Sequence, residues 1–181
     1  MPRILLVDDE PHVLSALRRV LKQPGSPDMG VLSIDICDKP QVALERVRDH
    51  PYDLILSDYR MPAMTGVAFL AAARQLQPDS ARLILSAHAD LTGLIGAINE
   101  AGIYRFIMKP WDDLELRMAL AEALQHRELI LENRRLADEV RLARGVISRQ
   151  ELALRRLEEE SPGITKVKWG ADGSVLLEDD E

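Results

Sequence analysis

Five polar residues each follow a short apolar run in this sequence: Asp8, Asp9, Asp58, Ser86 and Lys109. Three carboxylates gathered in one cleft repel one another unless a cation neutralises them. Carboxylate oxygens suit Mg²⁺, which keeps some of its water ligands. A hydroxyl and an ammonium group beside them would stabilise a tetrahedral, negatively charged phosphoryl group. One of the aspartates could then act as a nucleophile and form an acyl phosphate.

The apolar runs before these residues have the length and composition of buried strands. We predict strands at residues 4–7, 31–37, 53–57, 82–86 and 104–108. Helical spacing of apolar residues occurs between them, around residues 13–21, 42–47, 67–76 and 91–101, and again from residue 114. Strands that alternate with helices predict an α/β fold with a doubly wound, five-stranded parallel sheet. Ligands of such folds bind beyond the carboxyl ends of the strands, where the polar residues would meet.

The composition restricts the environment in which this chain works. The 181 residues are 46% hydrophobic and 29% charged, which suits one domain and an additional element. The net charge of −7 disfavours a broad nucleic-acid surface. The longest uncharged run, residues 61–73, is too short to span a bilayer, and the first residues do not have the pattern of a signal peptide. With Cys37 as the single cysteine, we expect a cytoplasmic protein with no membrane partner.

The residues around the five polar positions form recognisable motifs. These motifs are Leu6-Val7-Asp8-Asp9-Glu10, Leu56-Ser57-Asp58-Tyr59-Arg60-Met61-Pro62 with Gly66, Leu85-Ser86-Ala87, and Lys109-Pro110. They resemble the receiver domain of two-component response regulators over residues 1–125, which implies a flavodoxin-like receiver fold. The segment 102–112 is similar to receivers attached to HD-type cyclic-dinucleotide phosphodiesterases and to those of some transcriptional activators.

This resemblance implies a phosphorylation site with Mg²⁺ as cofactor. Asp58 would accept the phosphoryl group from a sensor histidine kinase or a phosphotransfer protein. Asp9 and Asp58 would bind Mg²⁺ directly, Asp8 would act mainly through water, and the backbone carbonyl of Arg60 would be a third protein ligand. The side chains of Arg60 and His88 would tune hydrolysis of the phosphoryl group; the alternative is that both are solvated loop residues.

The resemblance also implies how the site would sense the phosphoryl group. Lys109 would pair with the phosphoryl oxygens and, before phosphorylation, with Asp58. Ser86 would donate its hydroxyl to the phosphoryl group. Phe106 would be an aromatic switch that turns inward when Ser86 moves; the alternative is a residue that only fills the core.

Beyond residue 125, apolar residues recur with a heptad period. The predicted a and d positions are Leu129, Asn133, Leu136, Val140, Ala143, Ile147, Gln150, Leu154 and Leu157. They predict one long helix over residues 126–160 that continues from the last receiver helix and forms a coiled-coil homodimer. Asn133 favours a parallel pair, because two facing amides can bond to each other. A helix packed on its own receiver, or a solvated helix, is the alternative.

Residues 161–181 alternate apolar and charged side chains around turn residues, which predicts a small β-hairpin. It would lock the helix end or dock a partner. We expect no enzymatic activity beyond phosphoryl transfer to Asp58 and its hydrolysis. The function hypothesis is a dimeric response regulator that signals to an unknown protein partner. The alternatives are a phosphorylation-insensitive scaffold and a DNA-associated regulator that uses Arg134, Arg135, Arg141 and Arg144.

Overall fold

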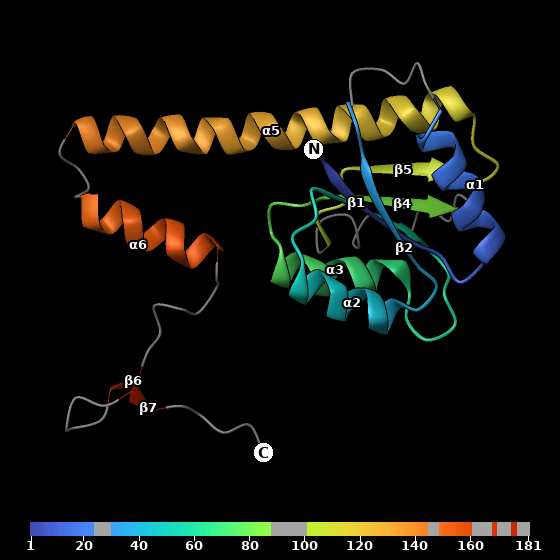
Figure 1. The fold of residues 1–181 in the computed structure, drawn as a ribbon, viewed down its shortest axis with the longest axis horizontal. Coiled ribbons are helices and arrows are strands. Elements are labelled where there is room, and N and C mark those ends of the chain that lie inside the picture. The colour runs from blue at the N-terminus through green and yellow to red at the C-terminus, as the bar shows by residue number, and fades with distance from the viewer. Residues whose placement is uncertain (24–29, 88–100, 145–148, 161–167, 170–174, 177–181) are drawn as a thin grey trace. The chain divides into compact units, whose positions relative to one another are not determined.

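The computed structural model describes residues 1–23, 30–87, 101–144, 149–160, 168–169 and 175–176 (Figure 1). The chain divides into two compact units, Met1–Leu131 and Glu132–Glu181. The first unit contains the large sheet and its helices. The second contains the end of one long helix, a further helix and two very short strands.

One parallel sheet forms the centre of the first unit. Its strands are β1 (Arg3–Val7), β2 (Ser33–Cys37), β3 (Leu54–Asp58), β4 (Ala81–Ser86) and β5 (Arg105–Met108). They lie in the order β2-β1-β3-β4-β5, and every neighbouring pair is parallel, so the predicted five-stranded fold is confirmed. The three central strands are almost completely buried, as expected for a parallel sheet that is covered on both faces.

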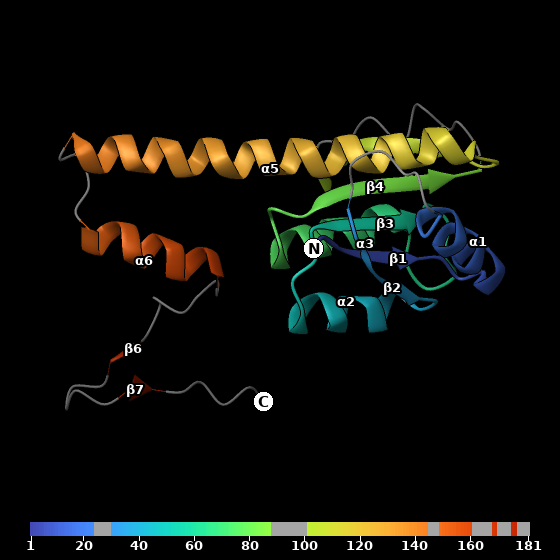
Figure 2. The same ribbon diagram turned by 45° about the horizontal axis from the view of Figure 1, so that its top comes forward.

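Helices cover both faces of this sheet (Figure 2). They are α1 (Pro11–Leu21), α2 (Pro40–Asp49), α3 (Gly66–Leu76) and α5 (Asp113–Ala143), which extends into the second unit. Leu6 of β1 belongs to the apolar core beneath α1 and α5. Its neighbour Leu5 belongs to the core beneath α2 and α3, because successive side chains of a strand point to opposite faces.

Local signals explain where these helices begin. Pro11 and Pro40 occupy the first turns of α1 and α2. Backbone N–H groups in a first turn have no acceptor within the helix, so proline, which lacks this group, breaks no helical hydrogen bond there. At the start of α3, the hydroxyl of Thr65 accepts a hydrogen bond of 3.2 Å from a backbone N–H. Oδ1 of Asp112 accepts two such bonds, both of 2.9 Å, at the start of α5. The sequence therefore specifies these boundaries locally.

The helix predicted at residues 91–101 lies outside the described residues, apart from Ala101. Gly102 follows with a φ of +60°, a left-handed conformation that glycine adopts at low cost at helix ends. The buried guanidinium of Arg82 donates hydrogen bonds to the carbonyls of Ala101 (2.9 Å) and Gly102 (3.3 Å). Strand β4 thus fixes the turn that leads into β5.

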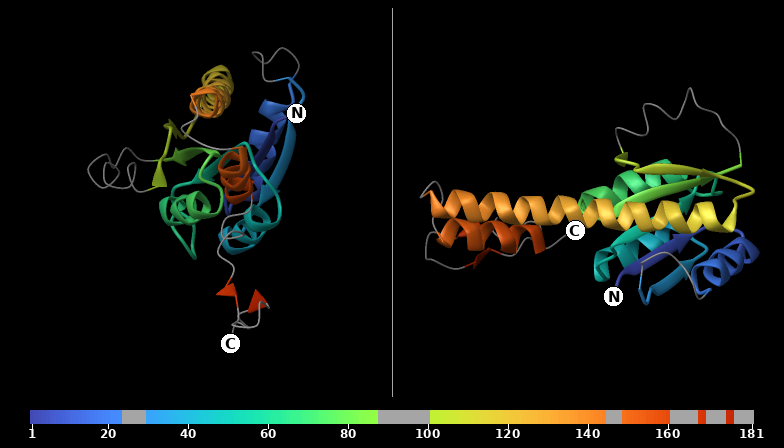
Figure 3. Two further views of the ribbon diagram at one scale, coloured as in Figure 1. Left: turned by 90° about the vertical axis from the view of Figure 1, so that its left-hand side faces the viewer. Right: turned by 90° about the horizontal axis from the view of Figure 1, so that it is seen from above.

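The C-terminal helix is shorter than predicted. A long helix is present, but α5 ends at Ala143 and a separate helix, α6, spans Arg149–Glu160 (Figure 3). Nη1 of Arg155 lies 3.9 Å from Oδ1 of Asp138, whereas one straight helix would separate residues 17 positions apart by about 25 Å. Gly145 lies between the helices, outside the described residues. Glycine costs a helix about 1 kcal/mol relative to alanine, so this residue type weakens the case for one continuous helix.

The C-terminal tail contributes two short strands. β6 (Lys168–Trp169) pairs antiparallel with β7 (Val175–Leu176), with Trp169 opposite Val175. The rest of residues 161–181 lies outside the described part of the chain, so the hairpin stays a prediction. Within the described residues, no helix has both the length and the apolar character needed to cross a bilayer.

Candidate functional site

Lys109 lies between two buried aspartates at the carboxyl edge of the sheet. Its Nζ is 2.5 Å from Oδ1 of Asp58 and 2.8 Å from Oδ2 of Asp8. Asp58 is 6% exposed and Asp8 is 0% exposed. Residues at the carboxyl ends of β1, β3 and β5 therefore meet at one point, although 101 positions of sequence separate Asp8 from Lys109.

The parallel register fixes the backbone around these side chains. Asp58 ends β3 and pairs with Leu85 of β4, the residue before Ser86. The backbone N–H of Tyr59 donates to the carbonyl of Leu85 at 2.8 Å, and the N–H of Lys109 donates to the carbonyl of Ser86 at 2.8 Å. These bonds extend the β3–β4 and β4–β5 pairings by one residue, and the pairing of Val7 with Ser57 places the end of β1 beside that of β3.

Each of the two aspartates uses its second oxygen locally. Oδ1 of Asp8 accepts a bond of 2.9 Å from the N–H of Glu10, and Oδ2 of Asp58 accepts one of 2.7 Å from the N–H of Arg60. Burial raises the pKa of the Asp8 carboxyl, against the opposing effects of Lys109 and the Glu10 amide. Burial alone would lower the pKa of Lys109, but its bonds to Asp58 and Asp8 raise it. The ammonium is therefore charged at neutral pH.

The donor set has the chemistry of a magnesium site. Asp8 and Asp58 present carboxylate oxygens to the same ammonium, so two negative charges share one positive charge there. Asp9, the other expected carboxylate, is partly buried beside Asp8. No group of three or more His, Cys, Asp or Glu side chains among the described residues is already arranged as a metal site. The fit to a hard divalent cation thus rests on the kind of donor, carboxylate oxygen, that these aspartates supply.

The structure describes three of the other expected site residues, Ser86, Phe106 and Arg60. Ser86 ends β4 and is 5% exposed. Phe106 pairs with Ile84 in the sheet and packs, partly buried, against the core beneath α3. The side chain of Arg60 is exposed, while its backbone contacts Asp58. His88 lies outside the described residues.

No role was predicted from the sequence for two further residues at the site. Oε1 of Glu10 is 4.0 Å from Nζ of Lys109, so a third carboxylate faces the ammonium. Gly66 begins α3, and a Cβ at this position would overlap the backbone oxygen of Asp58 and lie 2.9 Å from its carbonyl carbon. The sequence offers two signals for these residues: Glu10 is an acid directly after the aspartate pair, and Gly66 is a glycine shortly after Asp58.

The predicted dimer residues that the structure describes lie on exposed helix faces. Their large apolar side chains are about half exposed, at 56% for Leu129, 47% for Leu136, 48% for Val140, 53% for Leu154 and 47% for Leu157. Asn133 and Ala143 are also exposed. Ile147 and the side chain of Gln150 lie outside the described part of the chain. The heptad face is therefore split between α5 and α6.

Comparison with known proteins identifies the first unit. The family model of the response regulator receiver domain matches residues 4–121. A hydrogenase transcriptional regulatory protein of Cupriavidus necator is 36% identical over 153 residues, which cover 83% of this chain and 30% of that protein. A C4-dicarboxylate transport transcriptional regulatory protein of Pseudomonas aeruginosa is 31% identical over 180 residues, or 97% of this chain and 37% of that protein. The chain thus spans about a third of the length of these relatives.

Solved structures agree with this assignment. The signal receiver domain of an HD domain-containing protein from Pseudomonas fluorescens is 35% identical, with a TM-score of 0.63 over 70% of this chain and 97% of that one. A CheY-like receiver domain protein from Methanospirillum hungatei is 26% identical, with a TM-score of 0.63 over 71% and 97% of the two chains. The first of these bears out the expected likeness to receivers of HD-domain proteins.

Proposed function

Because the chain belongs to the response regulator receiver family, we propose that it is a two-component response regulator that accepts a phosphoryl group on Asp58. The donor is a sensor histidine kinase or a phosphotransfer protein. The observation that carries this proposal is the ammonium of Lys109 held between Asp8 and Asp58. A positive charge is thereby kept in position where the oxygens of a transferred phosphoryl group would arrive.

The proposed reaction moves the phosphoryl group from a histidine to Asp58. A carboxylate oxygen of Asp58 attacks phosphorus, the new O–P bond forms as the P–N bond breaks, and the imidazole leaves with the electron pair. Asp9, Asp58 and the Arg60 carbonyl would hold Mg²⁺, which would neutralise negative charge at the site. Lys109 exchanges its contact with Asp58 for a phosphoryl oxygen, and water later hydrolyses the acyl phosphate.

The proposed output is a change in protein interactions. Ser86 donates its hydroxyl to the phosphoryl group, and Phe106 turns inward on β5, which alters the surface of β5 and α5. The apolar residues of α5 and α6 pair with a second copy of the chain. The half-exposed side chains of Leu136, Val140 and Leu154 support this pairing, because such residues are stabilised by burial. The tail hairpin docks a partner or locks the helix end.

Control of transcription is a second candidate function. The observation that favours it is the likeness, over most of this chain, to two transcriptional regulatory proteins. Those proteins are about three times as long as this chain. Binding of labelled double-stranded DNA that weakens steeply with salt would favour this candidate over interaction with a protein partner alone.

Phosphoryl uptake measured by intact mass tests the main proposal. With acetyl phosphate and Mg²⁺, the wild-type chain should gain the mass of one phosphoryl group, and the Asp58→Asn variant should gain none. Asp49→Asn, which changes an exposed aspartate at the end of α2, is the matched control and should behave as wild type. Absence of uptake by the wild type would favour the phosphorylation-insensitive scaffold.

A further inference from the structure

The buried face of α5 continues into a charged residue. The residues of α5 that pack into the core are Leu116, Ala119, Leu120 and Ala123, all at most 1% exposed. Arg127 follows Ala123 by four positions and so lies on the same face of the helix, with only 25% of its side chain exposed. A guanidinium in this half-buried position requires polar partners, because leaving it unpaired would be costly.

The partners of Arg127 lie at the amino edge of the sheet, opposite the candidate site. Its Nη1 is 2.9 Å from Oδ1 of Asp53, and its Nε donates to the carbonyl of Asp79 at 3.0 Å. Oδ2 of Asp53 accepts a bond of 2.7 Å from the backbone N–H of Arg3. One guanidinium therefore joins α5 to the starts of β1, β3 and β4.

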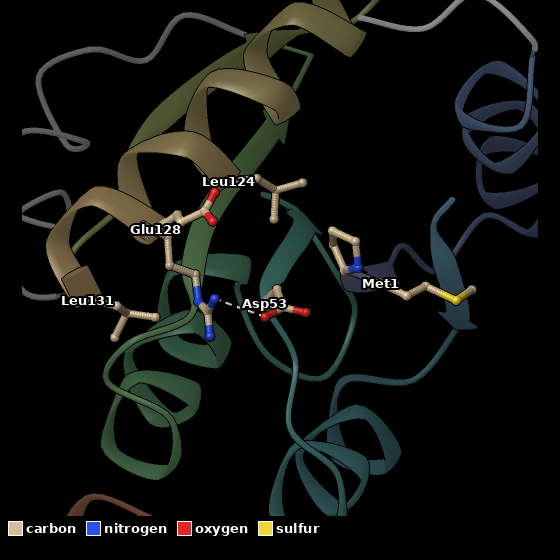
Figure 4. Close-up of a pocket in the computed structure, with 7 residues that line it drawn as sticks. Met1, Asp53, Leu124, Glu128 and Leu131 are labelled. Carbon is tan, nitrogen blue, oxygen red and sulfur yellow. Dashed lines mark ion pairs between the residues drawn. The ribbon is translucent and has the colours of Figure 1, made fainter. Parts of the chain in front are cut away.

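Packing around this ion pair is incomplete. The pair lies beside a cavity of about 370 Å³ that is also lined by Met1, Pro2, Leu124, Glu128 and Leu131 (Figure 4). Leu124 packs, partly buried, against the core beneath α1 and α5. Three residues further along α5, the ion pair and the hydrogen bond of Arg127 hold the helix to the sheet. The first compact unit ends at Leu131, about one helical turn beyond Arg127.

We propose that Arg127 and Asp53 form a positioning pair that fixes the last receiver turn of α5 and thereby couples the receiver to the helix beyond it. Asp53 directly precedes β3, whose last residue is Asp58, about 17 Å along the strand. The pair thus connects the strand that carries the proposed phosphorylation site to the helix that carries the proposed dimer residues. The coupling role rests on the proposed function, whereas the docking role does not.

Hydrogen exchange of the full chain tests the docking role. Arg127→Gln and Asp53→Asn should each speed exchange of the amides in residues 124–131 by roughly three- to tenfold, because a charge-assisted bond no longer holds that turn. Asparagine retains an oxygen that can accept from the N–H of Arg3, so Asp53→Asn mainly removes the charge. Exchange that stays at the wild-type rate in both variants would overturn the proposal.

A second ion pair on the same helix supplies the matched control. Nη2 of Arg105 lies 2.8 Å from Oε2 of Glu122, and both side chains are 44% exposed. Arg105→Gln should leave exchange in residues 124–131 unchanged. If it speeds exchange there as much as Arg127→Gln does, loss of any charge near α5 explains the effect and the specific role of Arg127 is wrong.

Beryllofluoride, a phosphoryl mimic, tests the coupling role. With Mg²⁺ and beryllofluoride, the wild-type chain should change its exchange in residues 124–131, and the Arg127→Gln chain should lose this response while taking up phosphoryl groups from acetyl phosphate as wild type does. A variant that keeps the full response would overturn the coupling role. If the wild type itself takes up no phosphoryl group, the proposed function fails, and the exchange result without the mimic still decides the docking role.

Discussion

The receiver unit and the C-terminal unit place the same kind of side chain in opposite surroundings. Leu54 and Leu56 of β3 are 0% and 1% exposed, whereas Leu136 of α5 and Leu154 of α6 are 47% and 53% exposed. The apolar residues of the receiver strands are buried by helices of the same chain, which cover both faces of the sheet. In the C-terminal unit the leucine side chains stay about half exposed, which is typical of helices that pack against another molecule.

The charged residues of the two units differ in the same way. In the receiver, the side chain of Lys109 is 16% exposed, and its ammonium lies between two buried carboxylates. In the C-terminal unit, Arg135 and Glu132 pair at 3.1 Å with side chains 59% and 49% exposed. Exposed pairs of this kind contribute about 0.3–0.5 kcal/mol. The charged group of the receiver is therefore fixed by buried partners, whereas this pair of the C-terminal unit lies in water.

The largest expected effect is the loss of a receiver leucine. Leu56→Ala should lower the free energy of unfolding by about 2–5 kcal/mol, because it removes buried methyl groups and leaves a cavity in the sheet core. Urea denaturation followed by circular dichroism measures this change. A loss below about 1 kcal/mol would contradict the view that the receiver core is closely packed.

Gly66→Ala should produce the next largest effect and would connect packing to the site. The added methyl group would press on the backbone of Asp58, at a cost of about 1–3 kcal/mol for overpacking. We expect slower phosphoryl uptake as well, because Asp58 would have to shift. Stability and the rate of uptake measured on the same sample test both parts. Wild-type values for both would show that the loop after β3 adapts freely.

Tyr52→Phe tests a polar contact of the receiver through its pH dependence. The Tyr52 hydroxyl is 2.9 Å from Oδ2 of Asp35, and burial together with this bond raises the pKa of Tyr52 to about 12. An unfolded tyrosine has a pKa of about 10, so the hydroxyl stabilises the fold fully below that pH and loses this contribution as pH rises through about 12.

The Tyr52→Phe chain should accordingly be about 1 kcal/mol less stable than wild type at pH 8. The difference should shrink as pH rises from about 10 towards 12. Urea denaturation of both chains across this range provides the measurement. A difference that stays constant over the range would contradict the assignment of the raised pKa to the folded state.

The smallest effect on folding is expected from Leu154→Ala in the C-terminal unit. Because this side chain is already 53% exposed, the receiver transition should change by less than about 0.5 kcal/mol. The same substitution should weaken dimerisation, measured by light scattering over a range of concentrations. A chain that stays dimeric to the same dilution as wild type would remove Leu154 from the proposed interface.

Much of the receiver could be predicted from the sequence because its signals are local. The uninterrupted apolar run before Asp8 indicates a buried strand, and parallel strands bring their carboxyl-end residues to one edge. The meeting of Asp8, Asp58 and Lys109 follows from that topology. The likeness to a known family then supplied the roles that topology alone does not assign.

Other features depend on contacts that no local pattern reports. The pairing of Arg127 with Asp53 joins residues 74 positions apart and interrupts an apolar stripe, so the sequence alone indicates only an amphipathic helix. The closeness of Glu10 to Lys109 likewise needs the folded geometry. The end of α5 at Ala143 cannot be predicted from the heptad period, because that period continues through Gly145. Gly145 is a weak signal for a helix end, since one glycine costs a helix only about 1 kcal/mol.

Chemical trapping of the phosphorylated residue tests the central claim most directly. Borohydride reduces an acyl phosphate to an alcohol, so treatment after acetyl phosphate and Mg²⁺ should convert residue 58 into homoserine. Peptide mapping by mass spectrometry should then find homoserine at that position alone, with Asp8 and Asp9 unchanged. Trapping at another aspartate, or homoserine at none, would contradict the assignment of Asp58 as the residue that accepts the phosphoryl group.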